Sequence, residues 1–298
     1  MVRKAMLGHQ GVKRLLSTIH LVTDSTAYLT EEAMASLQVH VVSLSVVYDN
    51  ESYLDTQKDH YEFAEYLRHA NPIPTTSQPT LTEFQDLYDR LTIDGSTVLS
   101  IHISSGLSGT YQVASMAAQS LKDRSIHVID SWSTVGGLQI QVEYLRQLID
   151  AGLPVEEVVS KALEMREKHK LLLLLDSLEF LHRGGRIGKA QSLFGSLLSI
   201  KPVLWLHNQG KVEVYDKIRT RRKAYGKIAE YVKENWELMG PLRIALSHIK
   251  AEAEVKEMQA MIQNAIPAAS PTIHSAGSVI AVHTGPGSIA VSFQPLEV

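Results

Sequence analysis

Apolar runs of strand length alternate with amphipathic stretches of helical spacing over residues 19–170. The strand-like runs cover residues 19–23, 39–48, 97–103 and 125–129. The helical stretches cover residues 30–37, 59–70, 81–91, 110–121, 135–150 and 154–169. Several begin at a residue that favours a helix start, such as Thr30, Thr80 or Pro154. This alternation predicts a mostly parallel sheet with flanking helices.

The pattern changes after residue 170. Strand-like runs cover residues 171–175, 202–206, 211–218, 242–249, 279–283 and 288–293, and helical stretches cover 189–200, 220–236 and 251–265. The sequence H-N-Q-G at 207–210 separates two of the runs and is typical of a β-hairpin. We therefore expect an α/β fold of two domains, with a mostly parallel sheet in residues 19–169 and a mixed sheet in residues 170–298. Residues 1–18 are expected to form an N-terminal extension.

Composition narrows the classes of function. The 298 residues carry a formal net charge of −3, so no global positive field favours nucleic acid. The chain has no cysteine, which excludes disulfides and thiolate chemistry, and its scattered histidines do not suggest a metal site. Residues 1–18 lack the apolar segment of a signal peptide, and the longest apolar run, 171–175, is too short to span a bilayer. These features predict a cytoplasmic protein with at most transient membrane contact.

Three polar loops follow predicted strands: D-S-T at 24–26, S-S-G-L-S-G-T at 104–110 and D-S-W-S at 130–133. Ligands of parallel α/β sheets bind beyond the carboxyl ends of the strands, so these loops are expected to converge. Residues 104–110 lead into a helix, whose first N–H groups and dipole favour an anion. Ser108 and Thr110 add hydroxyl groups, but the loop contains no lysine or arginine. A small or singly charged anion, with a carboxylate as first candidate, therefore fits better than a triphosphate.

Two other loops carry candidate ligand-binding groups. The sequence T-T-S-Q-P-T at 75–80 includes Thr76 and Ser77, and H-T-G-P-G at 283–287 includes His283 and Thr284. The simpler interpretation of the first loop is a turn that caps the next helix. The simpler interpretation of His283 is a core histidine with satisfied hydrogen bonds. Glycines beside His283 favour the functional interpretation, because they let a backbone approach a ligand closely.

A serine hydrolase is the alternative from a different class. Residues 106–110 nearly match the nucleophile-elbow motif G-x-S-x-G, but Thr110 stands where the motif requires glycine. Ser108, Asp130 and His283 also follow the chain order of the α/β-hydrolase triad. The sequence thus leaves open an esterase that uses these three residues.

Basic residues form two further candidate sites. Arg183 and Arg186 flank a Gly-Gly turn, and Arg219 lies in a basic stretch at 217–227 that continues into a predicted helix. Each could be an ordinary solvated group. Together they could also bind a partner that carries a phosphate.

The loops taken together resemble the DegV family, the bacterial fatty-acid-binding proteins that serve as carrier subunits of fatty acid kinase. The matching segments follow the family's order: V-T-D-S-T at 22–26, T-S-Q-P at 76–79, S-S-G-L-S-G-T-Y at 104–111, V-I-D-S at 128–131, R-G-G-R-I at 183–187 and H-T-G-P-G at 283–287. Residues 1–17 lie outside the family pattern.

The resemblance implies a protein without catalytic residues, metal or cofactor that binds a long-chain fatty acid in an apolar tunnel. The residues expected at the carboxylate are Thr76, Ser77, Ser108, Gly109, Thr110, His283 and Thr284. It further implies that a separate kinase subunit phosphorylates the carboxylate and that the acyl phosphate feeds phospholipid synthesis. Arg183, Arg186 and Arg219 are the candidates for contact with the kinase or the phosphate.

Overall fold

Four parallel strands form the sheet of the N-terminal part, in the order β2 (Val39–Val42), β1 (Ile19–Asp24), β6 (Thr97–His102) and β7 (Ser125–Asp130). The protein is seen in a computed structural model that describes residues 18–57, 60–193 and 201–296. Successive side chains of a strand face opposite sides of the sheet, so both faces of these apolar strands need cover. Helices α3 (Leu81–Thr92) and α4 (Thr110–Ser120) cover one face, where they pack on Val22 and Val98.

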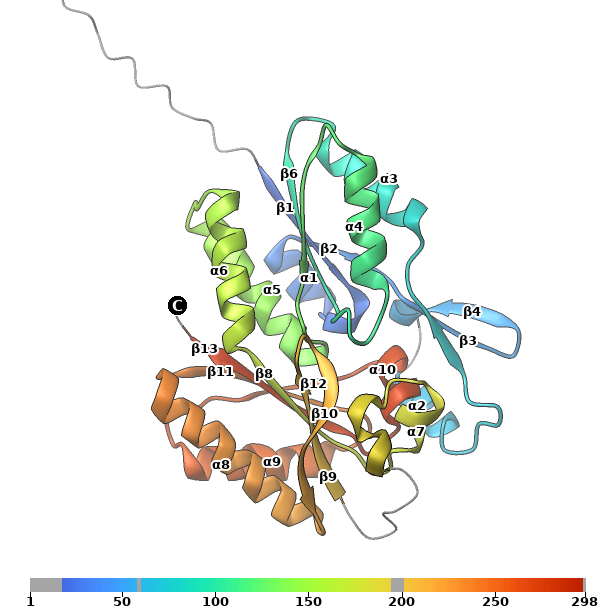
Figure 1. The fold of residues 1–298 in the computed structure, drawn as a ribbon, viewed down its shortest axis with the longest axis vertical. Helices are drawn as coiled ribbons and strands as arrows, with labels where there is room; N and C mark the ends of the chain where they lie inside the picture. The colour runs from blue at the N-terminus through green and yellow to red at the C-terminus, as the bar shows by residue number, and fades with distance from the viewer. Residues whose placement is uncertain (1–17, 58–59, 194–200, 297–298) are drawn as a thin grey trace, which may run out of the picture.

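The other face of this sheet carries Leu21 and Leu99. Helices α1 (Glu31–Leu37), α5 (Val135–Asp150) and α6 (Val155–Lys168) pack against it. The predicted caps are present: the Thr30 side chain accepts from the Ala33 N–H, and Thr80 forms a capping box with Glu83. Helix α5 also packs on the second sheet, so it lies between the two sheets (Figure 1).

The second sheet has six strands. Their order is β10 (Lys211–Ile218), β9 (Lys201–His207), β8 (Lys170–Leu174), β13 (Ile289–Pro295), β11 (Leu242–His248) and β12 (Thr272–Ser275). All neighbouring pairs are antiparallel except β11 and β12, so the sheet is mixed as predicted. Leu172 and Leu174 face α8 (Arg221–Met239) and α9 (Glu252–Ala265), which cover one face.

The opposite face of the second sheet, marked by Leu171 and Leu173, meets several short elements. These are α7 (Glu179–Arg183), the 3-10 helix η3 (Gly188–Leu193), α10 (Ser278–Thr284) and α2 (His60–Tyr66). Close by is a small antiparallel sheet of β4 (Glu51–Leu54), β3 (Ser45–Tyr48) and β5 (Thr75–Ser77). Leu44 and Phe63 thus share one apolar cluster with residues beyond 170, and the domain boundary near 170 stays a prediction.

Some predicted elements differ from the structure. The predicted strand at 279–283 is wrong, because residues 278–284 form helix α10. Residues 75–77, predicted as a turn, form the edge strand β5 on β3. Strands β4 and β12 were not predicted. Of the predicted helix at 189–200, residues 189–193 belong to the 3-10 helix η3, and 194–200 lie outside the described residues. Residues 1–17 of the predicted extension also lie outside them.

Candidate functional site

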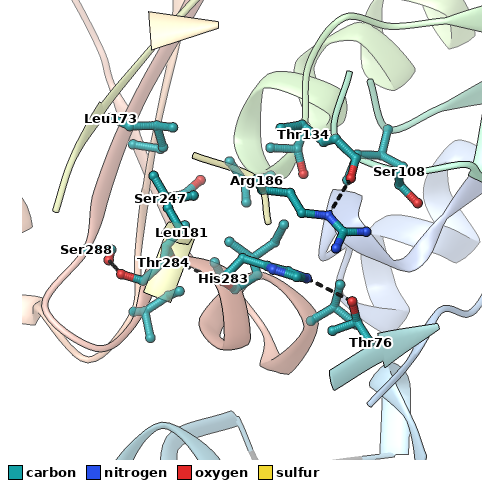
Figure 2. A pocket seen from close by; sticks show the side chains of 18 of the residues that line it. Thr76, Ser108, Thr134, Leu173, Leu181, Arg186, Ser247, His283, Thr284 and Ser288 are labelled. Carbon is teal, nitrogen blue, oxygen red and sulfur yellow. Dashed lines mark hydrogen bonds between the residues drawn. The ribbon is translucent and has the colours of Figure 1, made fainter. Parts of the chain in front are cut away.

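A cavity of about 250 Å³ lies between the two halves of the molecule (Figure 2). It is bordered by the second sheet, the start of α5, the loop after β6, and helices α7 and α10. Most of its wall is apolar, with contributions from Leu44, Ile103, Leu173, Leu181 and Val279. Such an apolar wall suits a long hydrocarbon chain, because both surfaces leave water when the chain binds.

Polar groups from three distant segments meet at one end of the cavity. Thr76 comes from β5, Ser108 from the loop after β6, and His283 from α10. Thr76 Oγ1 lies 2.8 Å from His283 Nε2 (Figure 2). Ser108 Oγ lies 2.9 Å from Thr110 Oγ1 and accepts a hydrogen bond from the Thr110 N–H at 3.3 Å. The structure therefore brings together two hydroxyls and an imidazole that the sequence had placed in three separate loops.

His283 is neutral at physiological pH. Burial and, to a smaller extent, the positive charge of Arg186 lower the pKa of its imidazole to about 4. Nδ1 of His283 has no hydrogen-bond partner among the described residues, and the ring packs on Gly184. A Cβ at position 184 would overlap that ring, so the glycine makes room for the histidine.

The predicted loops converge beside these groups. Ile103 N–H donates to Asp24 Oδ2 at 2.8 Å, and Ser105 N–H donates to Asp130 Oδ1 at 3.0 Å. Gly109 lies directly against the Gln78 side-chain amide, so the T-S-Q-P and S-G-T segments are in contact. Asp24 and Asp130 thus hold the segment that leads to Ser108 to the ends of β1 and β7, the two strands that flank β6.

The remaining predicted head-group residues lie nearby in different settings. Ser77 and Thr284 border the cavity, but the Ser77 hydroxyl donates to Gln78 O and the Thr284 hydroxyl donates to Ile280 O. Thr110 is fully buried at the first position of α4, where its hydroxyl contacts that of Ser108. Thr76, Ser108 and His283 therefore have the hydroxyl or ring atoms best placed to meet a ligand.

The predicted basic residues separate into two groups. Arg186 borders the cavity, and its Nε and Nη1 donate to Leu107 O and Gly184 O at 3.1 and 2.7 Å. A second, more polar cavity of about 400 Å³ adjoins the first and is bordered by Thr76, His283, Arg183 and Arg186. Arg219 is exposed after β10 and borders neither of these two cavities.

Nothing in the geometry favours the hydrolase alternative. The hydrogen bonds of Ser108 lead to Thr110, those of His283 lead to Thr76, and Asp130 Oδ1 accepts from the N–H groups of Ser105 and Trp132. Among the described residues, no hydrogen bond joins the three proposed triad members to one another. Within the part of the chain that the structure describes, Ser108 therefore forms no hydrogen bond to a base.

Sequence analysis missed a second serine–histidine–aspartate arrangement. Ser100 Oγ lies 2.7 Å from His102 Nε2, and His102 Nδ1 lies 3.1 Å from Asp24 Oδ2. All three residues are fully buried, and the Tyr88 hydroxyl donates to Ser100 Oγ at 2.8 Å. Ser100, His102 and Asp24 border neither cavity, so this network holds the ends of β1 and β6 together and does not contact a ligand there. The alternating polar positions 100 and 102 within β6 were its only local signal.

Sequence analysis also missed Thr134, which precedes α5. Its side chain is buried at the cavity wall, and its hydroxyl has no hydrogen-bond partner among the described residues. The described part of the chain contains no cluster of three or more metal-ligating side chains. Within the same residues, no helix combines the length and the apolar character needed to cross a membrane.

The chain is similar to known proteins over nearly its whole length. A family profile described as an uncharacterised protein of the DegV family matches residues 18–296. A DegV domain-containing protein of Deinococcus radiodurans is 35% identical over 282 residues, which cover 94% of this chain and 99% of that protein.

Two solved structures share the fold. A fatty-acid-binding DegV family protein from Thermus thermophilus is 34% identical, with a TM-score of 0.87 over 94% of this chain and 100% of the other. Another, from Streptococcus agalactiae, is 31% identical, with a TM-score of 0.88 over 94% and 99%. The architecture, the order of the loops and these similarities show that the chain belongs to the DegV family.

Proposed function

We propose that the protein binds a long-chain fatty acid in the apolar cavity, with the carboxylate at Thr76, Ser108 and His283. The observation that carries the proposal is an apolar cavity that ends in two hydroxyls and a buried imidazole. The relatives from Thermus thermophilus and Streptococcus agalactiae, which share the fold, are fatty-acid-binding proteins.

The apolar wall supplies the free energy of binding. Burying about 14 methylenes at about 0.8 kcal/mol each gives roughly 11 kcal/mol before the cost of ordering the chain. Polar groups at one end then fix the orientation of the ligand, because an unpaired carboxylate would be costly to bury. Charge-assisted hydrogen bonds from two hydroxyls and one imidazole offset that cost.

The same end of the cavity suits the presentation of a carboxylate to another protein. Arg186 borders both cavities, and the second, more polar cavity also has Arg183 on its wall. A phosphoryl group delivered from outside would meet these guanidinium groups, which suit phosphate oxygens. We propose that a separate kinase subunit docks here, phosphorylates the bound carboxylate and releases acyl phosphate for phospholipid synthesis. The protein itself would then act as a carrier without catalytic residues.

A cavity-filling substitution tests the binding site. Ala290 is buried and borders the cavity, so Ala290→Phe should place a ring where the acyl chain would lie and abolish fatty-acid binding. Ala229 is a similarly buried residue of α8, which packs on the opposite face of the second sheet, and Ala229→Phe is a control for general overpacking. Equal fatty-acid affinity in wild type and a folded Ala290→Phe variant would show that the ligand binds elsewhere.

The kinase role needs a separate experiment. Arg186→Ala should leave fatty-acid affinity nearly unchanged but lower acyl phosphate formation with a cognate fatty acid kinase. Arg183→Ala and Arg219→Ala test the other two candidates, and Lys168→Ala, an exposed cation paired with Glu164 on α6, is the control. Loss of fatty-acid binding together with acyl phosphate formation would place Arg186 in the lipid site and contradict its role toward the kinase.

A further inference from the structure

Helix α10 carries His283, yet its own sequence does little to start it. The helix has seven residues, and four of them are β-branched and favour strands: Val279, Ile280, Val282 and Thr284. The N-cap position is Gly277, which has no side chain to accept from the first N–H groups. A short helix of this composition needs partners from elsewhere in the chain.

Three side chains from the N-terminal half provide those partners. His60 Nδ1, at the start of α2, accepts from the Ser278 N–H at 3.2 Å and lies 3.0 Å from Ser278 Oγ. Asp55 Oδ1 accepts from the Val279 N–H at 3.0 Å. The Tyr28 hydroxyl accepts from the Ile280 N–H at 3.2 Å. Three consecutive N–H groups of α10 are therefore satisfied by residues more than 200 positions away.

The three side chains form one packed group, which we call the α10 clamp (Tyr28, Asp55 and His60). The rings of Tyr28 and His60 meet edge to face with centroids 5.7 Å apart. Gly277 lies against both rings, and a Cβ at that position would overlap them. The glycine that gives α10 no local cap is therefore the residue that lets the clamp reach the helix.

The charge in the clamp is buried. Asp55 is fully inaccessible to solvent, and burial raises the pKa of its carboxyl to about 6. Burial and the nearby charge of Asp55 both raise the pKa of Tyr28 well above its usual value, so the phenol stays neutral. An ionised carboxylate at the start of a helix also interacts favourably with the helix dipole. Burying the Asp55 carboxylate costs free energy unless it accepts hydrogen bonds such as that from the Val279 N–H, so the position of α10 depends on Asp55.

We propose that Asp55, together with Tyr28 and His60, is a positioning residue that sets His283 against Thr76 and so completes the carboxylate end of the cavity. The inference rests on the proposed function, since it assigns the clamp to the same head-group site. Asp55 lies just after β4 and Thr76 lies in β5, the two strands that flank β3. The small sheet and its clamp thus connect both sides of the Thr76–His283 hydrogen bond.

The test compares Asp55→Ala with Asp55→Asn, which keeps an oxygen acceptor for the Val279 N–H. Binding of palmitate and of hexadecanol is titrated for each, and the His283 ring nitrogens are followed by NMR. We expect Asp55→Ala to weaken palmitate binding about tenfold or more, to weaken hexadecanol binding much less and to shift the His283 signals. Asp55→Asn should recover most of the palmitate affinity.

The control is Thr30→Ala, which removes the N-cap of α1, another seven-residue helix that does not border the cavity. It should lower stability and leave the ratio of acid to alcohol affinity unchanged. If Asp55→Ala does not fold, Tyr28→Phe removes only the hydroxyl that accepts from Ile280, and the same measurements apply to it. Equal losses of acid and alcohol affinity, or unchanged His283 signals, would overturn the positioning role. Failure of the wild type to bind palmitate would instead contradict the proposed function.

Discussion

Binding of a fatty acid should raise the pKa of His283. In the free protein, burial holds that pKa at about 4, so the imidazole is neutral at pH 6. Thr76 Oγ1 is 2.8 Å from Nε2, so a carboxylate that reaches both groups would bring its charge to about 4 Å from the ring. At that distance the attraction to an imidazolium is about 4 kcal/mol at an effective dielectric constant of 20. The pKa of His283 should therefore rise by about 3 on binding.

Two measurements follow the change. NMR titration of the His283 ring nitrogens gives its pKa with and without palmitate. Calorimetry at pH 6 in buffers of different ionisation enthalpy counts the protons taken up on binding. Methyl palmitate carries no charge and is the matched control, since it should leave the pKa of His283 near its value in the free protein. Stoichiometric binding of palmitate with an unchanged pKa of His283 would refute the placement of the carboxylate beside this ring.

Two other predictions concern the head-group site, and a third concerns the buried His169. Ser108→Ala and Thr76→Val should each weaken palmitate binding by about 1.5–3 kcal/mol and weaken methyl palmitate binding much less. The effects of the two substitutions should not be additive in the double mutant, because both hydroxyls serve one carboxylate. Titrations that find equal losses for acid and ester would contradict this prediction. Gly184→Ala should displace the His283 ring, lowering palmitate affinity and shifting the ring's NMR signals, whereas Gly226→Ala, where a Cβ meets open space, should do neither. Burial lowers the pKa of His169 to about 3, so the unfolded chain takes up this proton first as pH falls below about 6.5. His169 should therefore lower the free energy of unfolding at pH 5 by about 2 kcal/mol relative to neutral pH. Urea denaturation should find a smaller decrease between these pH values in His169→Asn.

Local patterns in the sequence predicted most of the fold. Short apolar runs in β1 and β6, and caps such as Thr30 and Thr80, act within a few residues, so the parallel sheet and its helices could be recognised. Helix α10 could not, because its β-branched residues favour a strand and its partners are distant. Asp55 and Tyr28 satisfy its first N–H groups only once the chain has folded.

The candidate site shows the same division. The loop at 104–110 was conspicuous because small and hydroxyl residues joined a strand to a helix. The contact of Thr76 with His283 joins residues 207 positions apart, so no local pattern could reveal it. Family resemblance placed these residues at one site, and the structure brings them within hydrogen-bond distance. Arg219 was grouped with Arg183 and Arg186 by its charge and by the family resemblance, and neither could reveal that it borders neither of the two cavities.

The measurement that tests the central claim most directly is mass spectrometry of the lipid carried by the protein. The full chain is purified from a bacterial host, extracted under denaturing conditions and compared with the Ala290→Phe variant. We predict about one long-chain fatty acid per wild-type chain and little or none in the variant. Wild-type protein that carries no stoichiometric fatty acid, and takes none up on incubation with palmitate, would contradict the account.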